Sequence, residues 1–267
     1  MIILWIRELP DRAWEIITMI DDFFDIDSEP IVNFEAFYGP KKHLVDKCIV
    51  VFSKAIYEHI LQTFLCTQVA EIGACNGNIP VWSFDYKGEK VVFYLTPIGS
   101  ALAGGTVAEI NHITGASKFV MFGSCGSLDA ERTSGKFIIP TEAYRGEGLS
   151  YYFAKAQDYI AIKNTDEVAR IFMDLSIPYV QGKTWTTDSM IRETVNLVNK
   201  RKSEGCIVVE MEVAGVQAVC DFFGLELYNF LAAGDVLAEG NYTIDDLSDA
   251  NHNLDKLSIA LSIIERI

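Results

Sequence analysis

The sequence predicts an α/β protein, a single domain in which a mixed, mostly parallel central sheet lies between helices in three α/β/α layers. Three observations support this. Apolar runs of strand length alternate with helix-length segments. The runs are continuous, as in strands covered on both faces. No repeat, low-complexity tract or Pro/Ser-rich linker divides the 267 residues, and 50% hydrophobic content suits one large core.

Each element follows from its own stretch of sequence. We expect strands at Lys47–Phe52, Val91–Thr96, Phe119–Phe122, Phe137–Pro140, Tyr159–Ile162, Cys206–Met211 and Tyr228–Ala233. We expect helices at Ser53–Leu65, Ser100–Thr114, Asp166–Leu175, Ser189–Lys202, Glu212–Phe223 and Ile244–Ile264.

The first 28 residues read as a separate feature. Apolar residues recur there at helical spacing: Leu9, Ala13, Ile16, Ile17 and Ile20. This pattern predicts an amphipathic helix, either an appendage or an oligomer contact. We therefore expect a helical appendage at 1–28 and a single domain at 29–267.

The charge balance restricts the partners. Asp and Glu total 37 against 22 Lys and Arg, for a net charge of −15. This excess disfavours nucleic acid and anionic membranes and favours a small-molecule ligand. The first residues lack the pattern of a secretion signal, and no apolar run reaches the length of a membrane span. We expect a cytoplasmic protein.

The metal and redox chemistry of the chain also looks limited. The six cysteines show no CxxC spacing, which predicts reduced core thiols. The four histidines are far apart, without a ligand pattern such as HExxH, and no phosphate-binding GxGxxG or GxxxxGK[ST] motif follows a strand. We expect no metal and no cofactor.

Polar residues at the ends of buried strands are the candidates for chemistry. Cys206–Met211 delivers Glu210 and passes at once to Glu212, and burying two carboxylates without partners costs several kcal/mol. Such edges are where open α/β sheets place ligands. A carboxylate at Glu212 can accept from two vicinal hydroxyls, and a helix start favours its charge. The alternative is a helix-capping acid beside a core methionine, Met211. Glu210 could equally point into the sheet.

Polar residues also stand at the ends of two other predicted strands. Gly123-Ser124-Cys125-Gly126 predicts a tight turn whose N–H groups and hydroxyl hold an anion or a sugar hydroxyl, or else an ordinary glycine turn. Asp235 follows the apolar run Tyr228–Ala233, as a ligand-facing acid or as a loop cap.

Four segments together resemble the nucleoside phosphorylase superfamily of hexameric purine nucleoside phosphorylases, uridine phosphorylases and purine nucleosidases. They are FGSCGSL at 122–128, YRGEGLSYY at 144–152, TDSM at 187–190 and VEMEVA at 209–214. Their order and spacing are similar to the family pattern. The resemblance spans Lys47 to the C-terminus.

The resemblance implies a role for each candidate. Glu212 would contact the ribose 2′-hydroxyl and Met211 would pack against the sugar. Ser124, beside Gly123, would lie between the sugar and the phosphate or water that attacks it. Asp235 would protonate or hydrogen-bond purine N7 as the bond breaks, typically a gain of roughly 10²–10⁴-fold. Met190 stands where relatives place an aromatic residue against the base, although it could be a core methionine.

The chain departs from the family at the arginines that bind phosphate. Met121 stands in place of one arginine. The segment Phe52–Tyr57, with Ser53 and Lys54 in the nucleophile region, replaces a phosphate loop. Asn76–Trp82 has no counterpart of the partner-subunit arginine. Lys54, Arg145 or a neighbouring chain would have to substitute. The glutamate that orients water in hydrolytic relatives is also missing, since Glu58 is off-register.

These observations predict cleavage of the N-glycosidic bond of a purine nucleoside by phosphorolysis, with phosphate as co-substrate. A nucleosidase that uses water and a catalytically silent nucleoside-binding relative stay open as alternatives. Because relatives complete each site with a neighbour's residues, the resemblance also implies a homo-oligomer, a dimer or an assembly of dimers.

Overall fold

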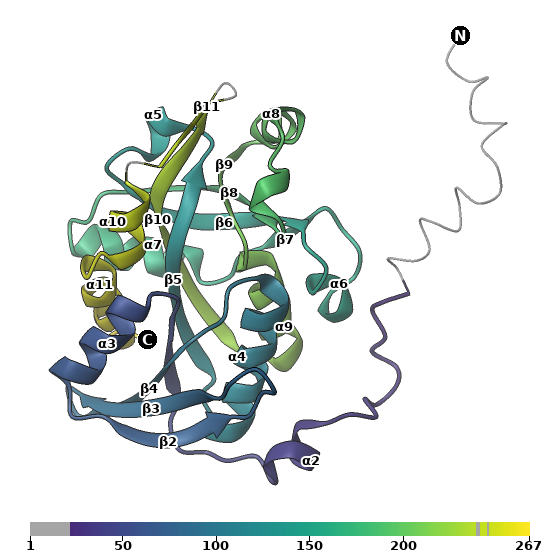
Figure 1. Ribbon diagram of the computed structural model, residues 1–267, viewed down its shortest axis with the longest axis vertical. Helices are drawn as coiled ribbons and strands as arrows, with labels where there is room; N and C mark the ends of the chain where they lie inside the picture. Colours follow the sequence, from purple (N-terminus) through teal and green to yellow (C-terminus); the bar gives the residue numbers. More distant parts are fainter. Residues whose placement is uncertain (1–21, 239–240, 245) are drawn as a thin grey trace, which may run out of the picture.

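The computed structural model describes residues 22–238, 241–244 and 246–267, and it confirms an α/β protein with a central sheet between helices (Figure 1). The predicted N-terminal helix falls mostly on residues 1–21, outside the described part. Its remainder, residues 22–28, contains turns and bends and no helix. A short helix, α2 (Phe34–Tyr38), precedes the first strand.

In the described residues, helices are interspersed among eleven strands. The strands are β1 (Lys47–Val51), β2 (Thr67–Ile72), β3 (Ile79–Tyr86), β4 (Glu89–Leu95), β5 (Lys118–Ser127), β6 (Phe137–Gly146), β7 (Tyr159–Ala161), β8 (Tyr179–Thr187), β9 (Cys206–Glu210), β10 (Glu226–Ala238) and β11 (Asn241–Thr243). The helices after α2 are α3 (Lys54–Thr63), α4 (Ser100–Thr114), α5 (Ala130–Thr133), α6 (Ser150–Phe153), α7 (Thr165–Asp174), the 3₁₀ turn η1 (Met190–Arg192), α8 (Val195–Ser203), α9 (Val213–Phe223), α10 (Leu247–His252) and α11 (Asp255–Ile264).

The strands form one sheet that closes on itself at one side. Its order is β11-β10-β6-β8-β9-β5-β1-β4-β3-β2, and β10 also pairs with β5. Strands β5, β10, β6, β8 and β9 therefore make a closed ring of pairings. Pairing is parallel along β4-β1-β5-β10 and along β6-β8-β9, and antiparallel at the other contacts.

Strand β5 belongs both to the closed ring and to the open part of the sheet formed with β1, β4, β3 and β2. One edge of β5 is unpaired between its contact with β1 and its contact with β9. Its pairing with β1 ends at Phe122, opposite Val51. Its pairing with β9 begins only at Gly126, opposite Val209. The intervening residues, 123–125, keep a neighbour on the β10 side alone. The sheet thus opens at this point.

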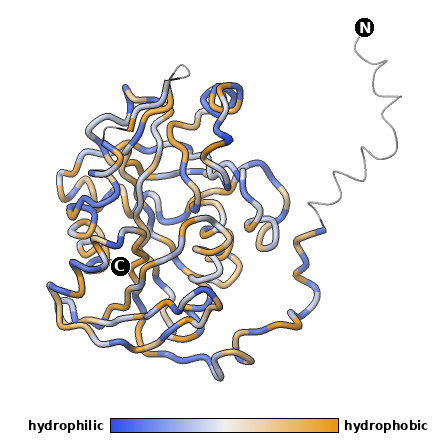
Figure 2. The backbone as a smooth tube through the Cα atoms, in the orientation of Figure 1, coloured by the Kyte–Doolittle hydropathy of each residue, from blue (hydrophilic) through white to orange (hydrophobic). Residues whose placement is uncertain are grey.

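Helices cover both faces of the sheet. On one face, α4 and α9 bury Val107, Ile110 and Val216 against the strands. On the other, α3, α7 and α11 bury residues such as Ile60 and Phe172. Figure 2 shows hydrophobic residues along the central strands. Burial on both faces is what the continuous apolar runs predicted.

Several predicted boundaries are wrong for identifiable reasons. Strands β2, β3 and β8 escaped prediction because polar residues interrupt them, for example Gln181 and Lys183 in β8. The predicted helix Ile244–Ile264 is two helices, and Asn253 accepts from the Asp255 N–H (2.8 Å) at the start of the second. Such a side chain satisfies a free N–H at a helix start.

The predicted helix Ser189–Lys202 is likewise interrupted. It divides into η1 and α8, separated by Glu193 and Thr194. Thr194 is extended and begins α8 as its N-cap residue, a position that threonine favours.

Candidate active site

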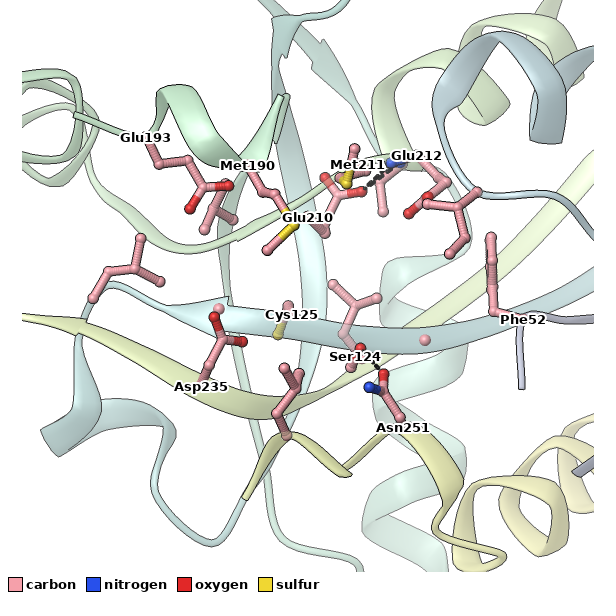
Figure 3. A pocket seen from close by; sticks show the side chains of 18 of the residues that line it. Phe52, Ser124, Cys125, Met190, Glu193, Glu210, Met211, Glu212, Asp235 and Asn251 are labelled. Carbon is pink, nitrogen blue, oxygen red and sulfur yellow. Dashed lines mark hydrogen bonds between the residues drawn. The ribbon is translucent and has the colours of Figure 1, made fainter. Parts of the chain in front are cut away.

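A cavity of about 700 Å³ lies at the open edge of β5. Every residue that the sequence placed in the site lines this cavity: Ser53, Lys54, Gly123, Ser124, Met190, Met211, Glu212 and Asp235. They come from segments far apart in the chain, which the closure of the sheet brings together (Figure 3).

The predicted turn at Gly123–Gly126 is wrong, because these residues continue strand β5. Side chains crowd the space around Gly126. A Cβ there would lie 2.6 Å from Leu237 Cδ1 and 3.1 Å from Asp235 Oδ2. The floor of the cavity is therefore the main chain of an extended strand.

Glu212 ties two helices together at the cavity wall. It is the N-cap residue of α9, and its Oε1 accepts from the N–H of Gly99 at the start of α4 (2.7 Å). Gly99 has φ of 96°, a conformation that favours glycine. Burial raises the pKa of Glu212, and the hydrogen bond from Gly99 opposes the shift. Oε1 is engaged, and the carboxylate still lines the cavity.

Glu210 accepts hydrogen bonds that fix the start of α9, next to Glu212. Its Oε1 accepts from the hydroxyls of Thr184 (3.1 Å) and Thr186 (2.5 Å), and its Oε2 accepts from the N–H groups of Glu212 (2.6 Å) and Val213 (2.7 Å). Burial, followed by the charge of Glu212, raises the pKa of Glu210 to about 7. The question whether Glu210 points into the sheet is thereby answered: it caps the start of α9.

Asp235 and Glu193 share the far end of the cavity (Figure 3). Asp235 lies within β10, not in a loop, and pairs with Gly126 directly after a register shift that follows Ala233. Burial raises its pKa, and a hydrogen bond from Tyr242 opposes the shift. Burial, and then the charge of Asp235, raises the pKa of Glu193 to about 7. A protonated carboxyl at Glu193 is therefore accessible near neutral pH.

Ser124 and Ser53 both contact helix α10. Ser124 Oγ donates to Asn251 Oδ1 (2.5 Å). Ser53 Oγ caps α3 by accepting from the Ile56 N–H (3.3 Å), and it lies 2.8 Å from His252 Nδ1. Apart from Lys54, the nucleophile region predicted from the sequence is therefore lined by hydroxyl, amide and imidazole groups.

Arg145 and Lys54, the two cations suggested as substitutes for the phosphate arginines, do not form a phosphate site in the cavity. Arg145 is 3% exposed and donates to Ser150 Oγ and to the carbonyls of Ala154, Lys155 and Gln157, away from the cavity. It therefore cannot substitute. Lys54 lines the cavity rim, with Nζ 3.6 Å from Glu58 Oε1. Among the described residues, no arginine lines the cavity.

Sequence reasoning missed Glu193, Asn251 and His252. Glu193 fell inside a predicted helix, and the other two lie in α10, which the sequence merged with α11. The sequence did offer a signal for the two helix breaks. Thr194 and Asn253 are residue types that favour the start of a helix, and each lies where a new helix begins.

The part of the chain that the structure describes holds no cluster of three His, Cys, Asp or Glu side chains that could bind a metal ion. None of its helices is long and apolar enough to cross a membrane. All six cysteines are free thiols, and four are buried.

Comparison with known proteins identifies a matching family model and several similar proteins. A family model described as the phosphorylase superfamily matches residues 46–264. The guanosine phosphorylase of Halorubrum lacusprofundi is 25% identical over 188 residues, 69% of this chain and 77% of that protein. A DeoD-type purine nucleoside phosphorylase of Bacillus cereus is 22% identical over 210 residues, 76% and 87% of the two chains.

A solved structure shares the fold. The 5'-methylthioadenosine/S-adenosyl homocysteine nucleosidase of Campylobacter jejuni superposes with a TM-score of 0.67 at 19% identity, covering 84% of this chain and 100% of that one.

Proposed function

This chain belongs to the phosphorylase superfamily, and from that premise we propose that it cleaves the N-glycosidic bond of a purine nucleoside. One observation carries the proposal. Glu212, suited to ribose hydroxyls, and Asp235, suited to a base nitrogen, line one cavity and lie at opposite sides of it (Figure 3). Met211 and Met190 supply apolar contact between them.

The two carboxyl groups divide the chemistry. Glu212 accepts from the ribose 2′-hydroxyl, and the charge-assisted bond offsets its burial. Asp235, whose pKa burial raises, donates its proton to purine N7. The base then leaves as a neutral molecule. Protonation by a placed acid typically contributes roughly 10²–10⁴-fold.

Water is the nucleophile that the cavity favours. The described lining holds four carboxyl groups, at Glu193, Glu210, Glu212 and Asp235, against the single ammonium of Lys54. A phosphate dianion in this setting would lack bidentate donors and would share the cavity with the ionised carboxylate of Glu212. We therefore propose hydrolysis to free ribose and purine.

Phosphorolysis is the second candidate, with phosphate as co-substrate. The names of the two phosphorylase relatives favour it. In that reaction the product is ribose 1-phosphate, and a neighbouring subunit would have to supply the cations. A homo-oligomer, a dimer or an assembly of dimers, stays part of this proposal, and light scattering at micromolar concentration tests it.

The decisive experiment measures turnover of inosine, adenosine and uridine with and without phosphate. We expect purine nucleosides to release base and free ribose at a rate that phosphate does not change. Strict phosphate dependence with ribose 1-phosphate as product would establish the second candidate. Nucleoside binding without turnover under either condition would refute both and favour a catalytically silent relative.

A further inference from the structure

We propose that His252 and Asn251, at the end of α10, hold the attacking water at the sugar side of the cavity. The inference rests on the proposed hydrolysis of a nucleoside. It starts from two hydrogen bonds that join α10 to the nucleophile region, Ser53 to His252 and Ser124 to Asn251. All four side chains line the cavity.

The contact with Ser53 fixes the histidine ring. Ser53 Oγ has two lone pairs and one proton. One lone pair accepts from the Ile56 N–H (3.3 Å) at the start of α3. The other is available to His252 Nδ1 at 2.8 Å. When Nδ1–H donates to it, Nε2 carries the lone pair and can accept a proton from water.

Asn251 supplies the complementary donor. Its Oδ1 is occupied by the Ser124 hydroxyl at 2.5 Å, and in Figure 3 its amide nitrogen points away from Ser124. Within residues 22–238, 241–244 and 246–267, no group accepts from this nitrogen. A water between Asn251 Nδ2 and His252 Nε2 would receive one hydrogen bond and donate another, which orients its remaining lone pair.

Helix α10 is held firmly enough to position both side chains. It packs against β10 at Gly234, where an added Cβ would lie 2.8 Å from Ala250 Cβ and 3.1 Å from Leu247 Cα. The buried ammonium of Lys256 donates to the carbonyls of Ala250 and Asn251. Placing a reacting group in this way is a general source of rate enhancement.

The step balances without a further reactant. The water oxygen forms a bond to ribose C1′ while one of its protons passes to His252 Nε2. The bond from C1′ to the base nitrogen breaks, and its electron pair stays with the base, which receives the Asp235 proton at N7. Proton return through solvent from His252 to Asp235 restores the enzyme.

The test compares His252→Gln with His59→Gln in the full chain. Glutamine can still hydrogen-bond to Ser53 but takes no proton. We expect His252→Gln to lower kcat roughly 100-fold, within the usual range for a general base, with little change in KM. His59 lies on α3 beside Thr63 and outside the cavity lining, so His59→Gln should keep wild-type kcat.

Chemical rescue adds a readout that a purely structural role would not produce. His252 is exposed, so free imidazole should restore turnover to His252→Ala in proportion to its concentration. Wild-type kcat in His252→Gln, or a slow His252→Ala that imidazole leaves unchanged, would overturn the inference while purine cleavage by the wild type stands. An inactive wild type would instead refute the proposed function itself.

Discussion

Replacing Glu210 by glutamine should change how the stability of the protein depends on pH. Glu210 is buried, and its pKa in the folded chain is about 7 against a usual 4.5. For an acid whose folded pKa is raised, the contribution to stability is fully present below pH 4.5 and is lost as pH rises through 7. At about 1.4 kcal/mol per pKa unit, the loss amounts to about 3 kcal/mol.

The assay is urea unfolding of the wild type and of Glu210→Gln at several pH values between about 5 and 8. Other titrating groups are common to both proteins, so the difference in unfolding free energy isolates this carboxyl. We expect that difference to shift by about 2.5 kcal/mol against the wild type between pH 5 and pH 8, because the first part of the loss occurs below pH 5. In a Glu212→Gln background the shift should shrink, because the Glu212 charge contributes to it.

The exposed Glu131 of α5 provides the matched control, since Glu131→Gln should leave the pH dependence of stability unchanged. A difference between wild type and Glu210→Gln that stays constant with pH would refute the reasoning.

Three further predictions concern catalysis. Asp235→Asn should lower kcat for purine nucleosides roughly 10²–10⁴-fold with KM nearly unchanged, because asparagine hydrogen-bonds N7 but cannot protonate it; full activity, or wild type preferring uridine, would contradict this. Glu212→Ala should cost about 3 kcal/mol in transition-state stabilisation, measured as kcat/KM against Glu131→Ala, and an unaffected kcat/KM would exclude the ribose contact. Gly126→Ala places a Cβ 2.6 Å from Leu237 and 3.1 Å from Asp235. It should therefore lower the unfolding free energy by about 1–3 kcal/mol and reduce kcat. Wild-type values of both quantities would show that the neighbouring side chains accommodate the methyl group.

Strand ends explain how much of the site could be predicted from the sequence. Ser124, Glu212 and Asp235 each belong to or follow a continuous apolar run. The closure of the sheet brings the ends of these strands together at one cavity. Their gathering in one cavity was therefore predictable. That residues 123–126 extend a strand was not, because glycines permit turns and extended chain alike, and only packing against Leu237 decides.

The residues that were missed depend on contacts distant in sequence. Glu193 enters the cavity because a helix breaks beside it, and its raised pKa depends on burial and on Asp235, 42 positions further along the chain. His252 joins the site through Ser53, at a separation of 199 residues. Neither periodicity nor local composition contains such information.

The strand floor of the cavity has an evolutionary consequence. Gly123 and Gly126 present no side chain, and one at Gly126 would displace Leu237 or Asp235, whereas a Cβ at Gly123 would lie 3.8 Å from its nearest neighbours. Mutation at Gly126 can therefore reshape little of the floor. The walls differ, since Met190 and Ile191 line the cavity from the short 3₁₀ turn η1, outside the sheet, and are exposed. New substrate preferences in descendants of this chain should arise by changes in this wall segment, while Gly126 stays glycine.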